Sequence, residues 1–135
     1  MARFIPILYA VEPGVILFYV LAGVTAVLLF LLIVFVEATA MQWVGWDHRN
    51  GCLKASLIMN LASVLPAMFS IYLVVQWREA GLAVAWLICV LIEGATLAYL
   101  KRGEQRANWL AALAANLASY LILLLPAYLI GVPRA

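Results

Sequence analysis

Two glutamates and two asparagines carry the most distinctive chemistry in this sequence, because they recur as pairs at one spacing. Glu37 is followed 23 positions later by Asn60, and Glu93 is followed by Asn116 at the same distance. All four belong to long apolar stretches, where a carboxylate is costly and normally finds a partner or water. The sequence therefore predicts an intramembrane polar layer formed by these four side chains.

Two kinds of chemistry fit such a layer. In the first, each carboxylate accepts a hydrogen bond from an asparagine amide and so fixes the register of the helices. In the second, the glutamates take up and release protons or cations. A polar anchor for a ligand or for a partner's helix is a further alternative. We favour the structural interpretation, because both glutamates are expected about 9 Å inside one interface, where the cost of a carboxylate is lower.

Serines extend the predicted layer along the same helix faces. Ser56 and Ser63 flank Asn60 at helical spacing, and Ser119 follows Asn116 by three residues. Small residues let membrane helices approach closely, and serine or asparagine can bond across the contact. These faces are therefore expected to point into the protein.

The polar residues belong to a longer internal repeat with an offset of 56 residues. The run Asn-Leu-Ala-Ser at 60–63 recurs at 116–119, and twelve positions between residues 31 and 73 match their counterparts. A repeat of this kind has to be settled before the fold is considered. We predict a duplicated helical hairpin, with one copy at about residues 14–76 and the other at about 80–131.

Composition places the predicted hairpins in a bilayer. Hydrophobic residues make up 69% of the chain, charged residues make up 10%, and the mean hydropathy is +1.13. Soluble domains average roughly 25% charged residues. Four stretches, at about 14–36, 53–75, 82–100 and 109–130, approach or exceed the roughly 20 residues that a spanning helix needs. The chain is thus predicted to be one all-α integral membrane domain over residues 1–135, with four transmembrane helices.

The connections predict an up-down-up-down bundle. The segment 76–81 is too short to join anything but antiparallel neighbours, so the two hairpins are parallel repeats about an axis along the membrane normal. Five basic residues lie in the longer loops, and three lie on the opposite side. This bias favours cytoplasmic loops at 38–53 and 101–108 and both termini outside. Residues 4–9 are expected to form a short interfacial segment, and no removable signal peptide is predicted.

The remaining reactive or rigid residues are given structural roles. His48 is the only histidine; it lies in a polar loop and is a weak candidate for ligating a pigment. Cys52 and Cys89 follow no metal-binding or disulfide pattern and are expected to act as small apolar fillers. Pro66 and Pro126 should kink their helices. No metal site or cofactor is predicted, although a bound lipid or pigment is compatible with the sequence.

The sequence shows no nucleophile paired with a base, no phosphate-binding loop and no basic surface for nucleic acid. An enzyme is therefore not predicted. The hypothesis we favour is a small accessory or structural subunit of a larger membrane complex, such as a respiratory or photosynthetic one, whose partners are lipids and the helices of other subunits. The alternative is a minimal transporter or channel that uses the two glutamates for proton or cation coupling.

Overall fold

The computed structural model describes residues 13–131, which are almost entirely helical. The elements are α1 (Pro13–Trp43), α2 (Arg49–Leu100), α3 (Gln105–Ser119), the π-helix η1 (Tyr120–Leu124) and α4 (Leu125–Gly131). The prediction of an all-helical chain with long apolar helices is confirmed. The interfacial segment predicted at 4–9 lies outside the described residues, as do two of the basic residues used for the orientation, Arg3 and Arg134.

Three helical stretches, not four, are long and apolar enough to cross a membrane in the described part of the chain: Gly14–Trp43, Arg49–Leu100 and Gln105–Ile130. The predicted count of four separate helices is wrong, because the stretches at 53–75 and 82–100 both fall within α2. The reason is that no loop separates these two stretches, because helical backbone lies directly on both sides of the turn between them. Within α2 the non-helical backbone is confined to Arg78, with φ 49° and ψ −119°.

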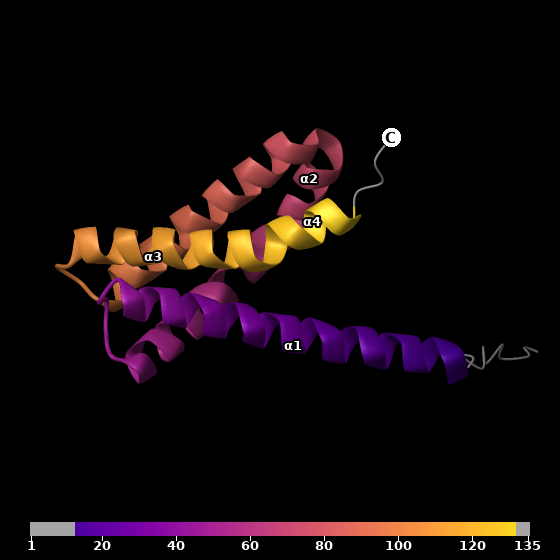
Figure 1. Cartoon of the computed structure of the whole chain (residues 1–135), viewed down its shortest axis with the longest axis horizontal. Coiled ribbons are helices and arrows are strands. Elements are labelled where there is room, and N and C mark those ends of the chain that lie inside the picture. The colour runs from indigo at the N-terminus through magenta and orange to yellow at the C-terminus, as the bar shows by residue number, and fades with distance from the viewer. Residues whose placement is uncertain (1–12, 132–135) are drawn as a thin grey trace, which may run out of the picture. The chain divides into compact units, whose positions relative to one another are not determined.

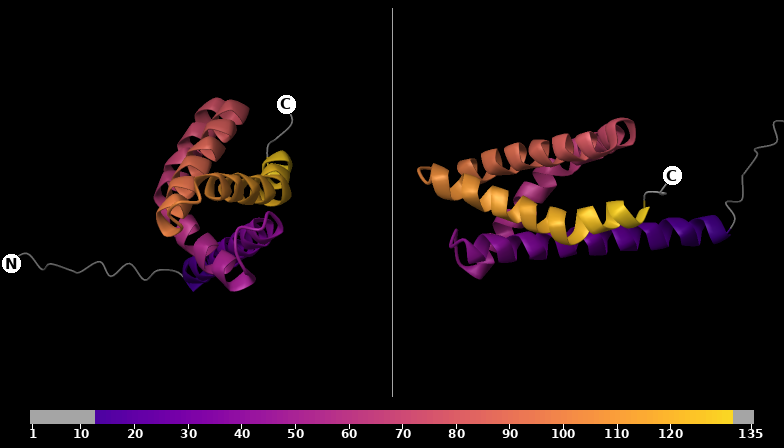
Figure 2. Two further views of the ribbon diagram at one scale, coloured as in Figure 1. Left: turned by 90° about the vertical axis from the view of Figure 1, so that its left-hand side faces the viewer. Right: turned by 45° about the horizontal axis from the view of Figure 1, so that its top comes forward.

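That residue reverses the direction of the chain. The Oγ atom of Ser63 lies 2.7 Å from Oε1 of Glu93, whereas 30 residues of straight helix would separate them by about 45 Å. Figures 1 and 2 show α2 doubling back on itself. The reversal brings backbone against backbone, since a Cβ atom added to Gly81 would lie 2.1 Å from the carbonyl oxygen of Leu73. We refer to the parts of α2 before and after Arg78 as its first and second arms.

The chain divides into two compact units, Met1–Leu31 and Leu32–Ala135, here called the N-terminal and C-terminal units. In the N-terminal unit, every residue from 14 to 29 is exposed. Thr25 and Tyr19 carry the only polar side-chain atoms in this stretch. This part of α1 is therefore apolar around its whole circumference.

The C-terminal unit has a packed core of small and flexible apolar side chains near the loops that join its helices. Its buried members are Ala38, Met41, Trp46, Cys52, Ala55, Met59, Leu97, Ala111, Ala112 and Ala115. Alanine lets the second arm of α2 approach α3 closely. The closest approach is at Gly94, where an added Cβ would lie 2.3 Å from the ring of Trp109.

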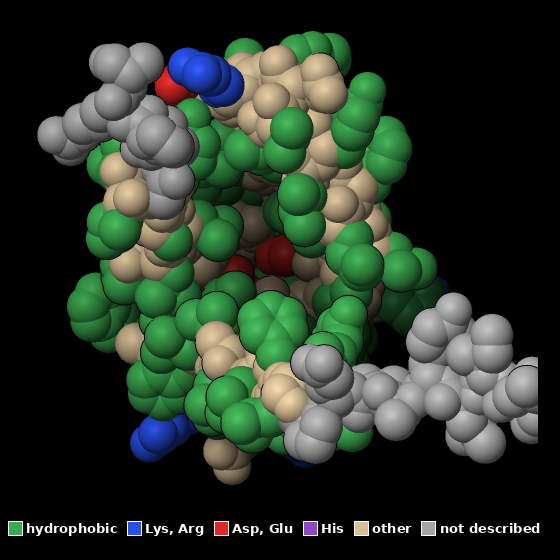
Figure 3. All heavy atoms as spheres, turned by 90° about the vertical axis from the view of Figure 1, so that its right-hand side faces the viewer, with side chains coloured by type: hydrophobic (Ala, Val, Ile, Leu, Met, Phe, Trp, Pro, Cys, Tyr) green, Lys and Arg blue, Asp and Glu red, His purple; other side chains and the backbone are tan. Residues whose placement is uncertain are grey.

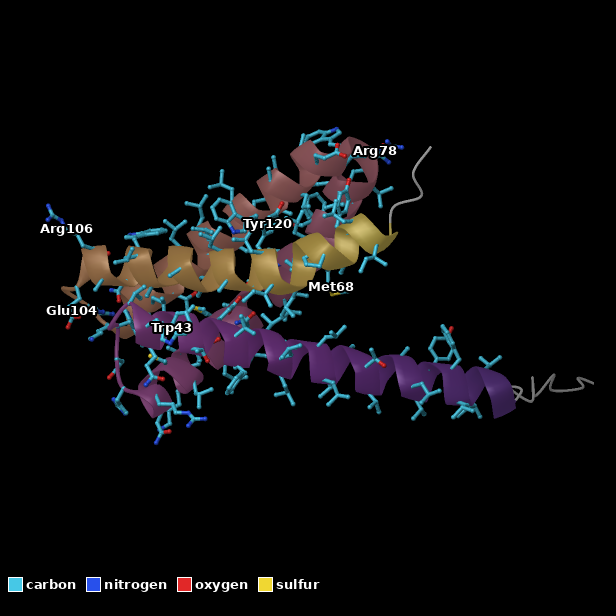
Figure 4. The ribbon with its side chains drawn as sticks, in the orientation of Figure 1. Trp43, Met68, Arg78, Glu104, Arg106 and Tyr120 are labelled. Atoms are coloured by element: carbon cyan, nitrogen blue, oxygen red, sulfur yellow. The ribbon has the colours of Figure 1, made fainter. Side chains whose placement is uncertain are left out.

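The two loops of this unit are tied to each other. The indole Nε1 of Trp46 donates to Oδ1 of Asn108 over 2.8 Å, and the Lys101 ammonium donates to the carbonyl oxygen of Trp46 over 2.8 Å. Figure 4 shows Glu104 and Arg106 at this end of the unit and Arg78 at the other end. The loops at 44–48 and 101–104 therefore lie on one side, and the reversal of α2 lies on the other.

The helical hydrogen-bonding pattern that begins in α3 changes just before a proline. The backbone N–H of Leu125 bonds the carbonyl of Tyr120, five residues earlier, and Pro126 follows directly. Proline has no N–H to donate and crowds the preceding turn, so the widened turn of η1 accommodates it. Pro66 lies inside α2, and the Ser70 hydroxyl donates to its carbonyl oxygen over 2.9 Å.

Candidate functional site

The structure brings the four residues of the predicted layer together in the C-terminal unit. Glu37 comes from the end of α1, Asn60 from the first arm of α2, Glu93 from the second arm, and Asn116 from α3. Their exposed fractions are 2%, 8%, 2% and 5%. Ser63 and Ser119, each three residues after an asparagine, lie in the same layer and are also buried.

Each glutamate is held by an asparagine and a serine from different segments. Oε2 of Glu37 accepts from the amide of Asn60, and its Oε1 accepts from the Ser119 hydroxyl over 2.8 Å. Glu93 shows the same arrangement: the Asn116 amide donates to its Oε2 over 2.7 Å, and Ser63 donates to its Oε1 over 2.7 Å. All four carboxylate oxygens therefore have a donor.

The donors are arranged crosswise. On the first arm of α2, Asn60 bonds Glu37 while Ser63, one turn on, bonds Glu93. On α3 the asparagine bonds Glu93 and the serine bonds Glu37. Exchanging each residue for its counterpart 56 positions away turns one set of contacts into the other, even to the oxygen atom used. Each asparagine-serine turn thus holds both glutamates, and the layer joins four helical segments.

One residue breaks this equivalence. The Ser56 hydroxyl donates to the carbonyl oxygen of Val34 over 3.0 Å and lies 3.4 Å from Oε2 of Glu37. The position 56 residues later is Ala112, which cannot bond Glu93. Glu37 is therefore more densely surrounded by polar groups than Glu93.

The two serines have a choice of acceptor. Ser63 Oγ also lies 3.1 Å from the carbonyl oxygen of Asn60, and Ser119 Oγ lies 3.3 Å from that of Asn116. A hydroxyl has one hydrogen to donate and can accept at the same time. If a glutamate were protonated, it could donate to the serine, and the serine hydrogen could turn to the backbone carbonyl. The layer can thus hold either protonation state without losing a hydrogen bond.

A cavity of about 360 Å³ begins at this layer and extends toward the Arg78 end of the unit. Glu93, Asn60 and Asn116 line one end of it, and the rest of its wall is mainly apolar. Figure 3 shows acidic side chains lying deep behind hydrophobic ones. Glu93 therefore borders open space, whereas Glu37 does not line this cavity.

Two aromatic side chains form part of the cavity wall. Trp86 and Tyr120 meet edge to face, with ring centroids 6.3 Å apart, and Figure 4 shows Tyr120 projecting from the start of η1 toward α2. The indole Nε1 of Trp86 is buried and has no hydrogen-bond partner among the described residues. The internal repeat gave no signal for this cavity.

The other predicted residues lie apart from the layer. His48 is on the surface, with Nδ1 2.6 Å from Oδ1 of Asp47 and its side chain 75% exposed. Cys52 is buried in the core near the loops, and Cys89 lines the cavity. Within residues 13–131, neither glutamate of the layer forms a salt bridge. Hydrogen bonds alone therefore hold the two carboxylates.

No protein-family model matches the chain, and no curated protein or solved structure matches it either.

Proposed function

We propose that this chain is a structural or accessory subunit that packs its helices against other subunits of a larger membrane complex. The observation that carries the proposal is the crosswise polar layer, in which every carboxylate oxygen has a donor from within the chain. Such a layer fixes four helical segments in register. A unit whose helices are held in one register by their own hydrogen bonds can present fixed apolar faces to partner helices.

The surface supports the same proposal. Residues 14–29 of α1 are apolar and exposed on all sides, and the C-terminal unit also exposes large side chains such as Leu65, at 77%, and Met68, at 64%. The loops within the described part of the chain are short, so chemistry outside the membrane has little to build on. Such surfaces allow contacts with the helices of other subunits.

The proposal includes four crossings of the membrane. If α2 were straight, its 52 residues would extend about 78 Å, more than twice the hydrocarbon thickness of roughly 30 Å. The reversal at Arg78 lets each arm cross once. The duplicated hairpins then run parallel, with both termini outside and the connecting loops in the cytoplasm, as the distribution of Lys and Arg favours. These loops are shorter than the predicted 38–53 and 101–108, because the helices leave only residues 44–48 and 101–104 between them.

The test is extraction from the native membrane in mild detergent, followed by native-gel separation and mass spectrometry of what comigrates. We expect stoichiometric comigration with a larger complex. A photo-crosslinking residue at Val24, in the exposed part of α1, should form adducts with a partner protein. Adducts with lipid alone at Val24, together with migration as an isolated monomer, would contradict the accessory role.

A second function is favoured by one specific feature, the double acceptor choice of Ser63 and Ser119. Because the layer keeps its hydrogen bonds in either protonation state, and because Glu93 borders a cavity, the glutamates are suited to exchanging protons. The corresponding proposal is a minimal transporter or channel that couples to protons or cations through Glu37 and Glu93.

Liposome flux measurements separate the two functions. For a coupled transporter, replacing both glutamates by Gln should preserve the helical fold and abolish pH-dependent flux. For an accessory subunit, the unaltered protein should show no flux. A substantial flux that is unchanged by both substitutions would rule out coupling through this layer.

A further inference from the structure

The cavity of the C-terminal unit offers hydrogen-bonding groups of opposite kinds at two levels. At the polar layer, the donors are already engaged. The amide nitrogen of Asn116 bonds Glu93 and the carbonyl oxygen of Ala112, and that of Asn60 bonds Glu37 and the carbonyl oxygen of Ser56. Both hydrogens of each amide are therefore used.

Acceptor capacity remains at the same level. A carboxylate has about four lone-pair positions, and Glu93 uses two of them, for Ser63 and Asn116. No Lys, Arg or His lines the cavity among the described residues. This end of the cavity can therefore receive a hydrogen bond from a ligand, but it has no free donor to offer.

The second level of the cavity, around Trp86, carries a hydrogen-bond donor that has no acceptor. Trp86 precedes Glu93 by seven residues on the second arm of α2, which is two helical turns or about 10 Å. Its buried Nε1–H lacks a partner within residues 13–131. A buried donor of this kind is costly unless something pairs with it. The Trp86 side chain lines the cavity, and a turn of its indole would present the N–H to a ligand there.

We propose that the cavity binds a lipid-soluble molecule with a hydroxyl group at one end and a second oxygen further along an apolar body. The hydroxyl donates to Glu93, and the second oxygen accepts from Trp86. The volume of about 360 Å³ lies within the range of ligand pockets, roughly 300–1,000 Å³. An acyl chain of a membrane lipid would fill the same apolar space but would leave both polar ends unpaired. The inference does not depend on the accessory role.

The test uses three probes of equal chain length: 1,8-octanediol, 1-octanol and 1-methoxyoctane. Each is titrated calorimetrically into the full chain in lipid nanodiscs, and the heat of partition into empty nanodiscs is subtracted. We expect saturable binding. When each affinity is referred to the concentration of the probe in the bilayer, the diol should bind about three- to tenfold tighter than octanol, as one added hydrogen bond gives. The ether, which cannot donate to Glu93, should bind most weakly.

Two variants make the test specific. Trp86→Phe keeps an aromatic ring but removes the N–H, so the diol should weaken to the affinity of octanol while octanol itself stays unchanged. Trp77→Phe is the matched control, because Trp77 is 58% exposed near the reversal of α2 and does not line the cavity; the advantage of the diol should persist. Ala85→Leu, which fills the cavity from its wall, should abolish saturable binding of every probe.

Equal affinities for the three probes would overturn the proposal and mark the cavity as an apolar crevice for lipid chains. An advantage of the diol that survives Trp86→Phe would also overturn it, as would the absence of saturable binding.

Discussion

Apolar sequence surrounds both the polar layer of the C-terminal unit and the exposed part of α1 in the N-terminal unit. The two regions differ in the interactions that decide which groups pack against them. In the layer, six buried side chains select one another by hydrogen bonds of fixed direction. Residues 14–29 have only Thr25 and Tyr19 as polar side chains, and all of them are exposed. In a bilayer the hydrophobic effect does not distinguish a lipid tail from a neighbouring leucine.

This difference shows how helical regions that are all apolar enough to cross a membrane can differ in what holds them in place. Hydrogen bonds and close backbone contacts give the C-terminal unit a definite internal register. The N-terminal part of α1 has neither, so its neighbours have to come from lipid or from other subunits. Substitutions of one kind, made in both regions, should therefore have unequal effects.

Glycine-to-alanine substitutions should give the largest contrast. An added methyl at Gly81 would overlap the carbonyl oxygen of Leu73, whereas one at Gly23 meets nothing within 4 Å. Gly81→Ala should lower the free energy of unfolding by about 1–3 kcal/mol or more. Gly23→Ala should leave it within about 1 kcal/mol of the original value and can raise it through helix propensity. Unfolding titrations with SDS measure both, and equal effects would remove the contrast.

Loss of an asparagine should have the next largest effect. Asn60→Ala or Asn116→Ala leaves a buried carboxylate oxygen without its amide donor, which we expect to cost about 1–2 kcal/mol in a membrane protein. Thr25→Ala in the N-terminal unit is the control and should change little. The loss of unfolding free energy in the double variant should differ from the sum of the losses in the two single variants, because residues in one hydrogen-bond network are coupled. Strict additivity in a double-mutant cycle would argue against one shared layer.

The serines should give a smaller and matched pair of effects. Ser63→Ala and Ser119→Ala each remove one neutral hydroxyl from a glutamate, so each should cost about 0.5–1.5 kcal/mol, and the two costs should agree. Ser70→Ala removes a hydroxyl that bonds the carbonyl of Pro66 on its own helix, and it should cost less. A large difference between the first two variants in the same SDS titration would show that the crosswise contacts are not equivalent.

Sequence spacing was sufficient to anticipate which polar residues meet. Glu37 and Asn60 recur with Ser63 at a fixed offset, and helical periodicity puts such residues on one face. Their crosswise arrangement was not predictable, because either partner choice satisfies the same spacing.

Other features depend on geometry that a hydropathy profile does not contain. The count of helices failed because the turn between residues 53–75 and 82–100 is confined to one residue, Arg78, so that the two stretches are joined as one helical element. The bond between Trp46 and Asn108 joins a loop to the first turn of α3, and neither residue is identical to its counterpart in the repeat. The unpaired indole of Trp86 depends on the cavity beside η1, and no local pattern of residues marks that cavity.

The smallest predicted effect lies at the half-exposed Asp47, in the loop before α2 and outside the long apolar helices. The backbone N–H of His48 donates to its Oδ1 over 2.7 Å, and this bond favours the charged carboxylate and lowers the pKa of Asp47. A carboxyl group whose pKa is lower in the folded state adds stability above its unfolded pKa of about 3.9, and this contribution is lost as the pH falls through the folded value. NMR titration of the Asp47 carboxyl should give a midpoint below about 3.9. Asp47→Asn should remove this titration while the polar layer stays intact, and a midpoint at or above the ordinary value would show that the bond to His48 does not persist in solution.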